Sequence, residues 1–88
     1  MAVYSVLYDL KKPGRDYSGL YRAIKALGPW WHYLESTWLV DTHLDASDIF
    51  GRLKSHIDQN DRVLVVKVSN PRSGWLPKGA WEWLEGRL

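Results

Sequence analysis

The sequence predicts an α+β domain in which two helices pack on one face of a four-stranded antiparallel sheet. Three observations lead to this prediction. Four short segments are rich in β-branched and aromatic residues, and two segments between them repeat their apolar residues at helical spacing. The segments follow the order β-α-β-β-α-β. A chain of 88 residues, 45% of them hydrophobic, suits one packed core and is too short for several domains.

The first third of the chain predicts a strand, a turn and a helix. Residues 2–10 are rich in Val, Tyr and Leu, which predicts a mostly buried strand ending at Asp9. Residues 11–15 combine Pro13 and Gly14 with three cations, which predicts a basic turn. From Asp16 onward the apolar spacing becomes helical, and Gly28-Pro29 ends it, so we expect an amphipathic helix of about three turns. Its expected apolar face consists of Tyr17, Leu20, Tyr21, Ile24 and Leu27.

The middle of the chain predicts a hairpin, a second helix and a last strand. Residues 30–34 and 35–42 are aromatic and β-branched, so we expect two paired strands with a turn near Leu34-Glu35-Ser36. Asp45 has the side chain of a helix N-cap, and Asn60-Asp61 closes that helix. Residues 63–68 predict the last strand. The apolar face expected for the second helix consists of Ala46, Ile49, Phe50, Leu53 and Ile57.

The last twenty residues predict an appendage to this core. Residues 70–78 contain Pro, Gly and Ser and predict a loop, in which Trp75 and Leu76 need cover. Residues 80–88 place Trp81, Leu84 and Leu88 at helical spacing, so we expect a short helix laid over the sheet or over a partner chain. The whole chain, 1–88, is therefore expected to be one ferredoxin-like βαββαβ domain with a core at 2–68 and a C-terminal appendage at 69–88.

Composition narrows the classes of function. The absence of cysteine excludes a disulfide framework, a thiolate zinc site and a cysteine nucleophile. Twelve Lys and Arg against ten Asp and Glu give a net charge of +2, which permits nucleic-acid binding. Apolar runs such as 63–66 are too short to span a bilayer, and no signal peptide precedes Val3. We therefore expect a cytoplasmic protein with no membrane partner.

The strand end at Asp9 is the first candidate site. A carboxylate at this position can hold Mg²⁺, or Mn²⁺, while Lys11 and Lys12 beside it bind phosphate oxygens. Magnesium usually requires one or two carboxylates, so a symmetric dimer that brings two copies of Asp9 together would make a better site. The alternative is that Asp9 caps the following turn through its own backbone amides.

Cations and aromatic residues form the second candidate site. If they lie near Asp9, then Lys11, Lys12, Arg15 and Arg22 form a positive funnel for a phosphate backbone. Trp30 or Tyr33 could add faces on which unpaired bases stack. The alternative is that the six tryptophans mostly form the core and a dimer interface. His32 could act as a base or contact phosphate, or simply lie on the polar face of an edge strand.

Two motifs and the order of elements resemble known families over residues 2–68. The motifs are Tyr8-Asp9-Leu10 at the end of the first strand and Glu35-Ser36-Thr37-Trp38-Leu39-Val40 after the first helix. They resemble the ferredoxin-fold, nuclease-like subunit of the CRISPR adaptation complex and the virulence-associated protein D ribonucleases. A closer likeness is to the short bacterial proteins labelled the SinR family.

The resemblance implies a homodimer in which Asp9 of each chain lies near the two-fold axis with a divalent metal between them. Only Asp9 corresponds by motif, and Tyr8, Ser36 and Thr37 are candidates for support close to it. The resemblance thus implies a metal-dependent endonuclease, most readily an endoribonuclease. The alternative is a non-catalytic dimeric module of a defence or toxin–antitoxin system that binds RNA, DNA or a protein partner.

Overall fold

The computed structural model describes residues 1–12 and 14–88, so the part of the expected basic turn at Pro13 lies outside the described residues. Four strands form one antiparallel sheet in the order β2-β3-β1-β4. They are β1 (Ala2–Asp9), β2 (Trp30–Leu34), β3 (Thr37–Thr42) and β4 (Arg62–Lys67). The central strand β1 pairs with β3 on one side and with β4 on the other. The predicted fold class is confirmed, because this order and connectivity are ferredoxin-like.

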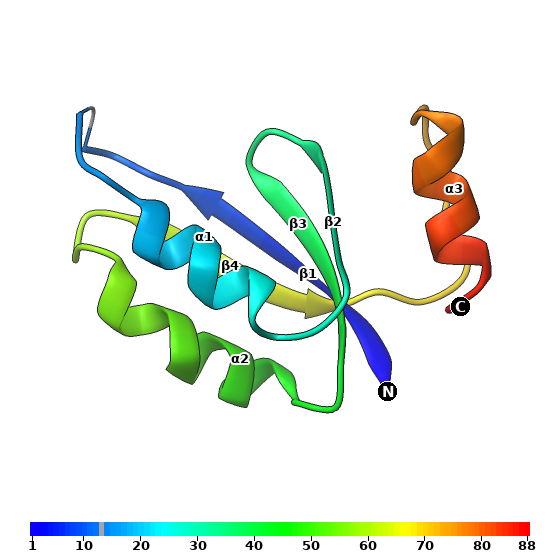
Figure 1. The fold of residues 1–88 in the computed structure, drawn as a ribbon, viewed down its shortest axis with the longest axis horizontal. Coiled ribbons are helices and arrows are strands. Elements are labelled where there is room, and N and C mark those ends of the chain that lie inside the picture. The colour runs from blue at the N-terminus through cyan, green and yellow to red at the C-terminus, as the bar shows by residue number, and fades with distance from the viewer. Residues whose placement is uncertain (13) are drawn as a thin grey trace.

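Helices α1 (Ser18–Lys25) and α2 (Ala46–Leu53) lie side by side over one face of the sheet, and a short 3₁₀ turn, η1 (Lys54–His56), extends α2 (Figure 1). The predicted N-cap is confirmed, since the Asp45 carboxylate accepts a hydrogen bond of 2.8 Å from the Asp48 amide. The predicted hairpin turn at residues 34–36 is also confirmed by the gap between β2 and β3. None of the helices in the described part of the chain is long and apolar enough to cross a membrane.

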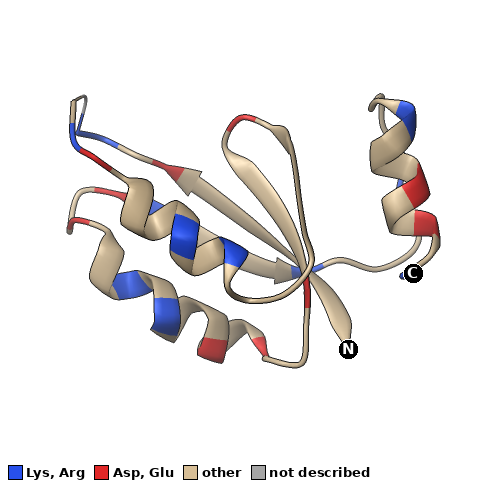
Figure 2. Cartoon of the chain, in the orientation of Figure 1, with Lys and Arg blue, Asp and Glu red and all other residues tan. Residues whose placement is uncertain are grey.

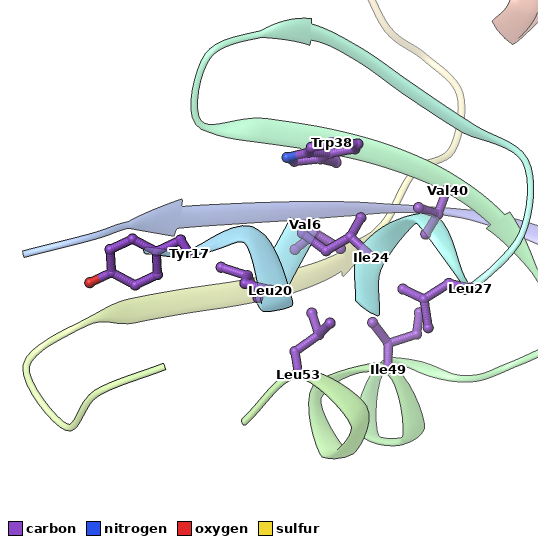
Figure 3. Close-up of a cluster of buried hydrophobic side chains, with 9 residues drawn as sticks. All are labelled: Val6, Tyr17, Leu20, Ile24, Leu27, Trp38, Val40, Ile49 and Leu53. Atoms are coloured by element: carbon purple, nitrogen blue, oxygen red, sulfur yellow. The ribbon is translucent and has the colours of Figure 1, made fainter. Parts of the chain in front are cut away.

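The main core lies between these helices and the sheet. Leu20 and Ile24 of α1 and Ile49 and Leu53 of α2 point toward Val6 on the central strand (Figure 3). This arrangement follows from helical spacing, which places one apolar stripe of each helix against the sheet. The buried members of this cluster are Val6, Tyr17, Leu20, Ile24, Leu27, Trp38, Val40, Ile49 and Leu53.

A second, smaller cluster lies on the opposite face of the sheet. Helix α3 (Lys78–Glu85) stands apart from α1 and α2 and buries Ala80 and Leu84 against that face (Figure 1). Their buried partners are Val3, Trp31 and Leu39, one from each of three strands. The expectation that the C-terminal helix covers the sheet is therefore confirmed.

Several sequence predictions were wrong in detail. The first helix has eight residues, fewer than about three turns, because the chain leaves helical geometry after Lys25 and before Gly28. Phe50 is 41% exposed, since a helix over a flat sheet buries only the stripe formed by Ile49 and Leu53. Trp75 is 99% exposed because the loop before α3 leaves the sheet. The last helix ends at Glu85, so Leu88 lies beyond it and is 36% exposed.

Candidate functional site

Asp9 is exposed to solvent at the end of the central strand. Tyr8 packs toward the main core, so its neighbour Asp9 points to the opposite face of the sheet. The Asp9 carboxylate forms an ion pair of 2.7 Å with Lys11 Nζ, and the side chain is 62% exposed. Across the sheet Asp9 is paired in register with Arg62, and both line a shallow hollow with Leu7 and Leu64. Asp9 therefore remains accessible to a ligand or a partner.

The other two turn cations, Lys12 and Arg15, are paired with one acid from a distant loop. Asp58 lies between α2 and β4, and its carboxylate contacts Arg15 at 2.5 Å and Lys12 Nζ at 3.2 Å. These contacts hold the pKa of Asp58 below its usual range, and the hydrogen bond with Arg15 contributes most to the lowering. Of the three cations, Lys11 contacts Asp9, whereas Lys12 and Arg15 contact Asp58, so each of them already has a carboxylate partner. Arg22 lies elsewhere, on α1.

Asp61 connects the basic turn after β1 to the loop before β4. It is 6% exposed, and its carboxylate accepts hydrogen bonds from the Lys11 amide, the Asp58 amide and the Tyr17 hydroxyl at 2.8–2.9 Å. Burial alone would raise the pKa of Asp61, but these hydrogen bonds together lower it. Sequence reasoning assigned Asp61 only to the end of a helix, because nothing in its neighbours indicates a partner fifty residues away.

Of the residues expected to support Asp9, Tyr8 lies on β1 and contacts the β2–β3 hairpin, to which Ser36 and Thr37 belong. The Tyr8 hydroxyl accepts a hydrogen bond from Trp38 Nε1 at 2.9 Å and donates one to the Glu35 carbonyl at 3.2 Å. Burial raises the pKa of Tyr8. Ser36 accepts from the Tyr8 amide through its carbonyl, and Thr37 is paired with Leu7. Among the described residues, neither the Ser36 nor the Thr37 hydroxyl is hydrogen-bonded to Asp9. The two residues adjoin the end of β1 only through backbone pairing.

An aromatic platform lies beside α1, on the face of the sheet that carries the main core. We use this name for Trp30, His32 and Trp38 together. Trp38 is 2% exposed, and the His32 ring stacks on it with centroids 3.8 Å apart and planes 14° apart. Trp30 lies tilted against Trp38 at 5.2 Å and is 43% exposed. Because His32 is also exposed, the platform presents two aromatic side chains to solvent above one buried indole.

Two cations of α1 accompany the platform. Lys25 Nζ lies 5.1 Å from the Trp30 ring centroid and 5.9 Å from that of Trp38, within cation–π range. Arg22 lies one turn earlier on the same helix, and α1 itself carries no acidic residue (Figure 2). Within residues 1–12 and 14–88, neither cation takes part in an ion pair. Their charges are therefore available to an anionic ligand.

Tyr33, the other expected stacking residue, lies on the opposite face. It packs edge-on against Trp31 at 5.1 Å, and a Cβ built on Gly79 of α3 would lie 2.8 Å from its hydroxyl. Neighbouring strand residues point to opposite faces, so a single strand of nucleic acid cannot stack on Trp30 and Tyr33 at one surface.

At the end of β1, one chain offers the exposed Asp9 carboxylate as a ligand for magnesium. Among the described residues, no group of three or more His, Asp or Glu side chains could hold a metal ion. The neighbouring positive groups, Lys11 and Arg62, are not ligands for a cation. A carboxylate from a second molecule would add a further ligand at this position.

Comparison of the chain with protein-family models, curated proteins and solved structures found no match.

Proposed function

We propose that this protein binds nucleic acid through the surface formed by the aromatic platform and the exposed side of α1. The observation that carries the proposal is the position of Lys25 over Trp30, with Arg22 one turn away. Free cations beside exposed aromatic rings are the combination with which proteins hold a phosphate backbone and its bases.

The contrast with the strand end supports this choice of surface. At the strand end, Lys11, Lys12 and Arg15 face Asp9 and Asp58, so a phosphate would compete with carboxylates already in place. On α1, the contacts of Lys25 are aromatic faces, which a cation leaves readily because an exposed cation–π contact is worth only about 0.5–1 kcal/mol. A phosphate therefore gains a partner at α1 at little cost.

The proposal is tested by the salt dependence of binding to labelled oligonucleotides. For the wild-type protein, the logarithm of the affinity should fall linearly with the logarithm of the salt concentration. Replacing Lys25 or Arg22 by Gln should weaken binding and reduce that slope by about 0.7 per lost phosphate contact on a single strand. Lys78→Gln is the matched control, since Lys78 lies on α3 in an ion pair with Glu82. Equal slopes for all the variants would contradict the proposal, and no binding at all would leave a protein partner as the better hypothesis.

A second candidate is a metal-dependent endonuclease formed by two copies of the chain. The observation that favours it is the exposed Asp9 carboxylate beside an incompletely covered apolar surface. On edge strand β4, Leu64 is 58% and Val66 is 43% exposed. The alternate residues Val63 and Val65 pack toward the main core. Because neighbouring side chains of a strand point to opposite faces, Leu64 and Val66 point away from α1 and α2. A second copy on this surface would bury both side chains and bring another Asp9 to the same interface.

Incubation with labelled RNA and DNA, with Mg²⁺, Mn²⁺ or EDTA, separates the two candidates. The nuclease predicts cleavage that requires a divalent cation and is lost in Asp9→Ala. Asp48→Ala serves as the control, since Asp48 is an exposed acid on α2. Cleavage that persists in Asp9→Ala would exclude the mechanism, whereas binding without cleavage supports the first candidate alone.

A further inference from the structure

We infer that the aromatic platform is a subsite for unpaired bases, with His32 as the residue on which a base stacks and Trp30 as its neighbour. This inference rests on the proposed function and names its ligand: a single strand, of RNA or DNA, and not a duplex. It is carried by the stack of His32 on Trp38 and by the exposure of both His32 and Trp30.

The stack is built to be extended outward. Trp38 is buried, with Tyr21 stacked near it at 6.1 Å and 23° and His32 stacked on it at 3.8 Å and 14°. A planar base placed on the open side of His32 would continue this series of near-parallel rings. Every base has such a face, so the contact tolerates any sequence but requires a base that is not already stacked within a duplex.

The rings are held in position before any ligand arrives. His32 Nε2 donates to the Glu35 carbonyl at 3.1 Å, and the same carbonyl accepts from the Tyr8 hydroxyl. Tyr8 in turn accepts from Trp38 Nε1, so one network fixes the orientation of both stacked rings. A ligand therefore does not need to order these side chains, which reduces the entropic cost of binding.

The charges around the platform suit a phosphate backbone. Lys25 lies next to Trp30, and Arg22 adds a second positive charge one turn earlier on α1. The hairpin turn contributes one carboxylate, that of Glu35, whose main chain anchors His32. We expect this charge to oppose a strand that passes over the turn, so Glu35→Gln should strengthen binding while leaving the stack intact.

The inference is tested by fluorescence anisotropy with short labelled oligo(U), oligo(dT) and a duplex of the same length. The single strands should bind more tightly than the duplex, and the two single-strand arms distinguish RNA from DNA. Trp30→Leu and His32→Ala should each weaken single-strand binding by roughly 5- to 150-fold, the effect of losing one stacked base. Trp75→Leu is the matched control, because Trp75 is 99% exposed in the tail loop and should be neutral. Far-UV circular dichroism verifies that each variant is folded.

Each outcome has one meaning. If single strands bind and the platform variants weaken them while Trp75→Leu does not, the inference holds. If the folded Trp30→Leu and His32→Ala proteins bind single strands as the wild type does, or if the duplex binds equally well, the inference fails while the proposed function remains. If no oligonucleotide binds to the wild type, both fail.

Discussion

At the scale of single residues, Gly28 and Gly51 have opposite roles. Gly28 adopts a φ of 153°, and a Cβ there would lie 2.2 Å from the Asp41 carbonyl oxygen of β3. Gly51 lies inside α2, and a Cβ there would meet nothing within 4 Å. The first glycine allows the chain to pass close to a strand as it leaves α1, whereas the second only weakens its helix.

We therefore predict opposite effects of the same substitution. Gly28→Ala should destabilise the fold by more than about 1 kcal/mol, because the backbone of β3 cannot move aside. Gly51→Ala should stabilise it by about 0.5–1 kcal/mol through helix propensity. Urea denaturation of the two variants measures both values. A Gly28→Ala protein as stable as the wild type would contradict the close contact with Asp41.

Asp61 predicts how stability depends on pH. The pKa of this carboxyl is lowered in the folded state, so its contribution is complete above the unfolded-state pKa of about 3.9 and is lost as the pH falls below that value. Asp58 changes in the same direction. The melting temperature should therefore decrease on acidification below about pH 4. Between neutral pH and about pH 4, these two groups should cause no such decrease.

Asp61→Asn checks the origin of this effect. Asn has an NH₂ group in place of one carboxylate oxygen, so at least one of the three donors would face another donor and lose its hydrogen bond. The melting temperature at neutral pH should therefore decrease by roughly 10 °C. The decline on acidification should also become shallower. Tyr17→Phe removes a single donor and should have a smaller effect. An unchanged pH profile in Asp61→Asn would show that other carboxyls determine it.

Sequence reasoning succeeded and failed at this scale for physical reasons. The N-cap at Asp45 was predictable because a cap contacts an amide three residues away. The contacts of Asp61 with Lys11 and Tyr17 join positions far apart in the chain, and any acid in the loop before β4 has the same local appearance. Trp30 and Tyr33 were both expected as stacking residues, but they lie on opposite faces of the sheet, and the stack of His32 on Trp38 was not predicted.

At the scale of elements, helix α2 begins at a well-formed cap. The Asp45 carboxylate binds the Asp48 amide, and Asp48 places a second negative charge in the first turn. Periodicity located α1 and α2 because each buries one narrow stripe, and the same reasoning misplaced Phe50 because it lies at the margin of that stripe. Helix ends were less predictable, since fraying and 3₁₀ turns such as η1 leave no clear signal.

The cap predicts a measurable loss when it is removed. Asp45→Ala should destabilise the fold by about 1 kcal/mol, because the Asp48 amide loses its partner. Ser47→Ala, at an exposed position in the same turn, should change stability little. Chemical denaturation compares the two variants. Equal effects would indicate that the Asp45 hydrogen bond contributes nothing.

At the scale of the whole molecule, the two faces of the sheet are covered unequally. Two helices cover one face, while α3 covers part of the other and leaves Leu64 and Val66 exposed on edge strand β4. Edge strands with exposed apolar residues readily pair with other chains. The order of elements was predictable from the sequence because each has a clear period, but the extent of this open surface depends on where α3 packs.

The homodimer of the second candidate gives a prediction at this scale. If two copies meet at this surface, Leu64→Lys should shift the protein to a monomer, because the interface would have to bury a lysine. Light scattering coupled to size-exclusion chromatography measures the mass directly. Leu34→Lys is the matched control, since Leu34 is 45% exposed on β2, at the other edge of the sheet. A wild-type monomer at high concentration would exclude the dimer.

The register of the central strand gives β1 two sets of neighbours in alternation. The Val3 carbonyl accepts a hydrogen bond from the amide of Val68, just after β4. The Tyr8 amide donates to the carbonyl of Ser36, just before β3. In an antiparallel sheet this alternation continues along the strand, so odd-numbered amides of β1 point to β4 and even-numbered amides to β3. Deuterium uptake at single amides of this strand would therefore report separately on detachment of the two halves of the sheet, and would reveal which half opens first.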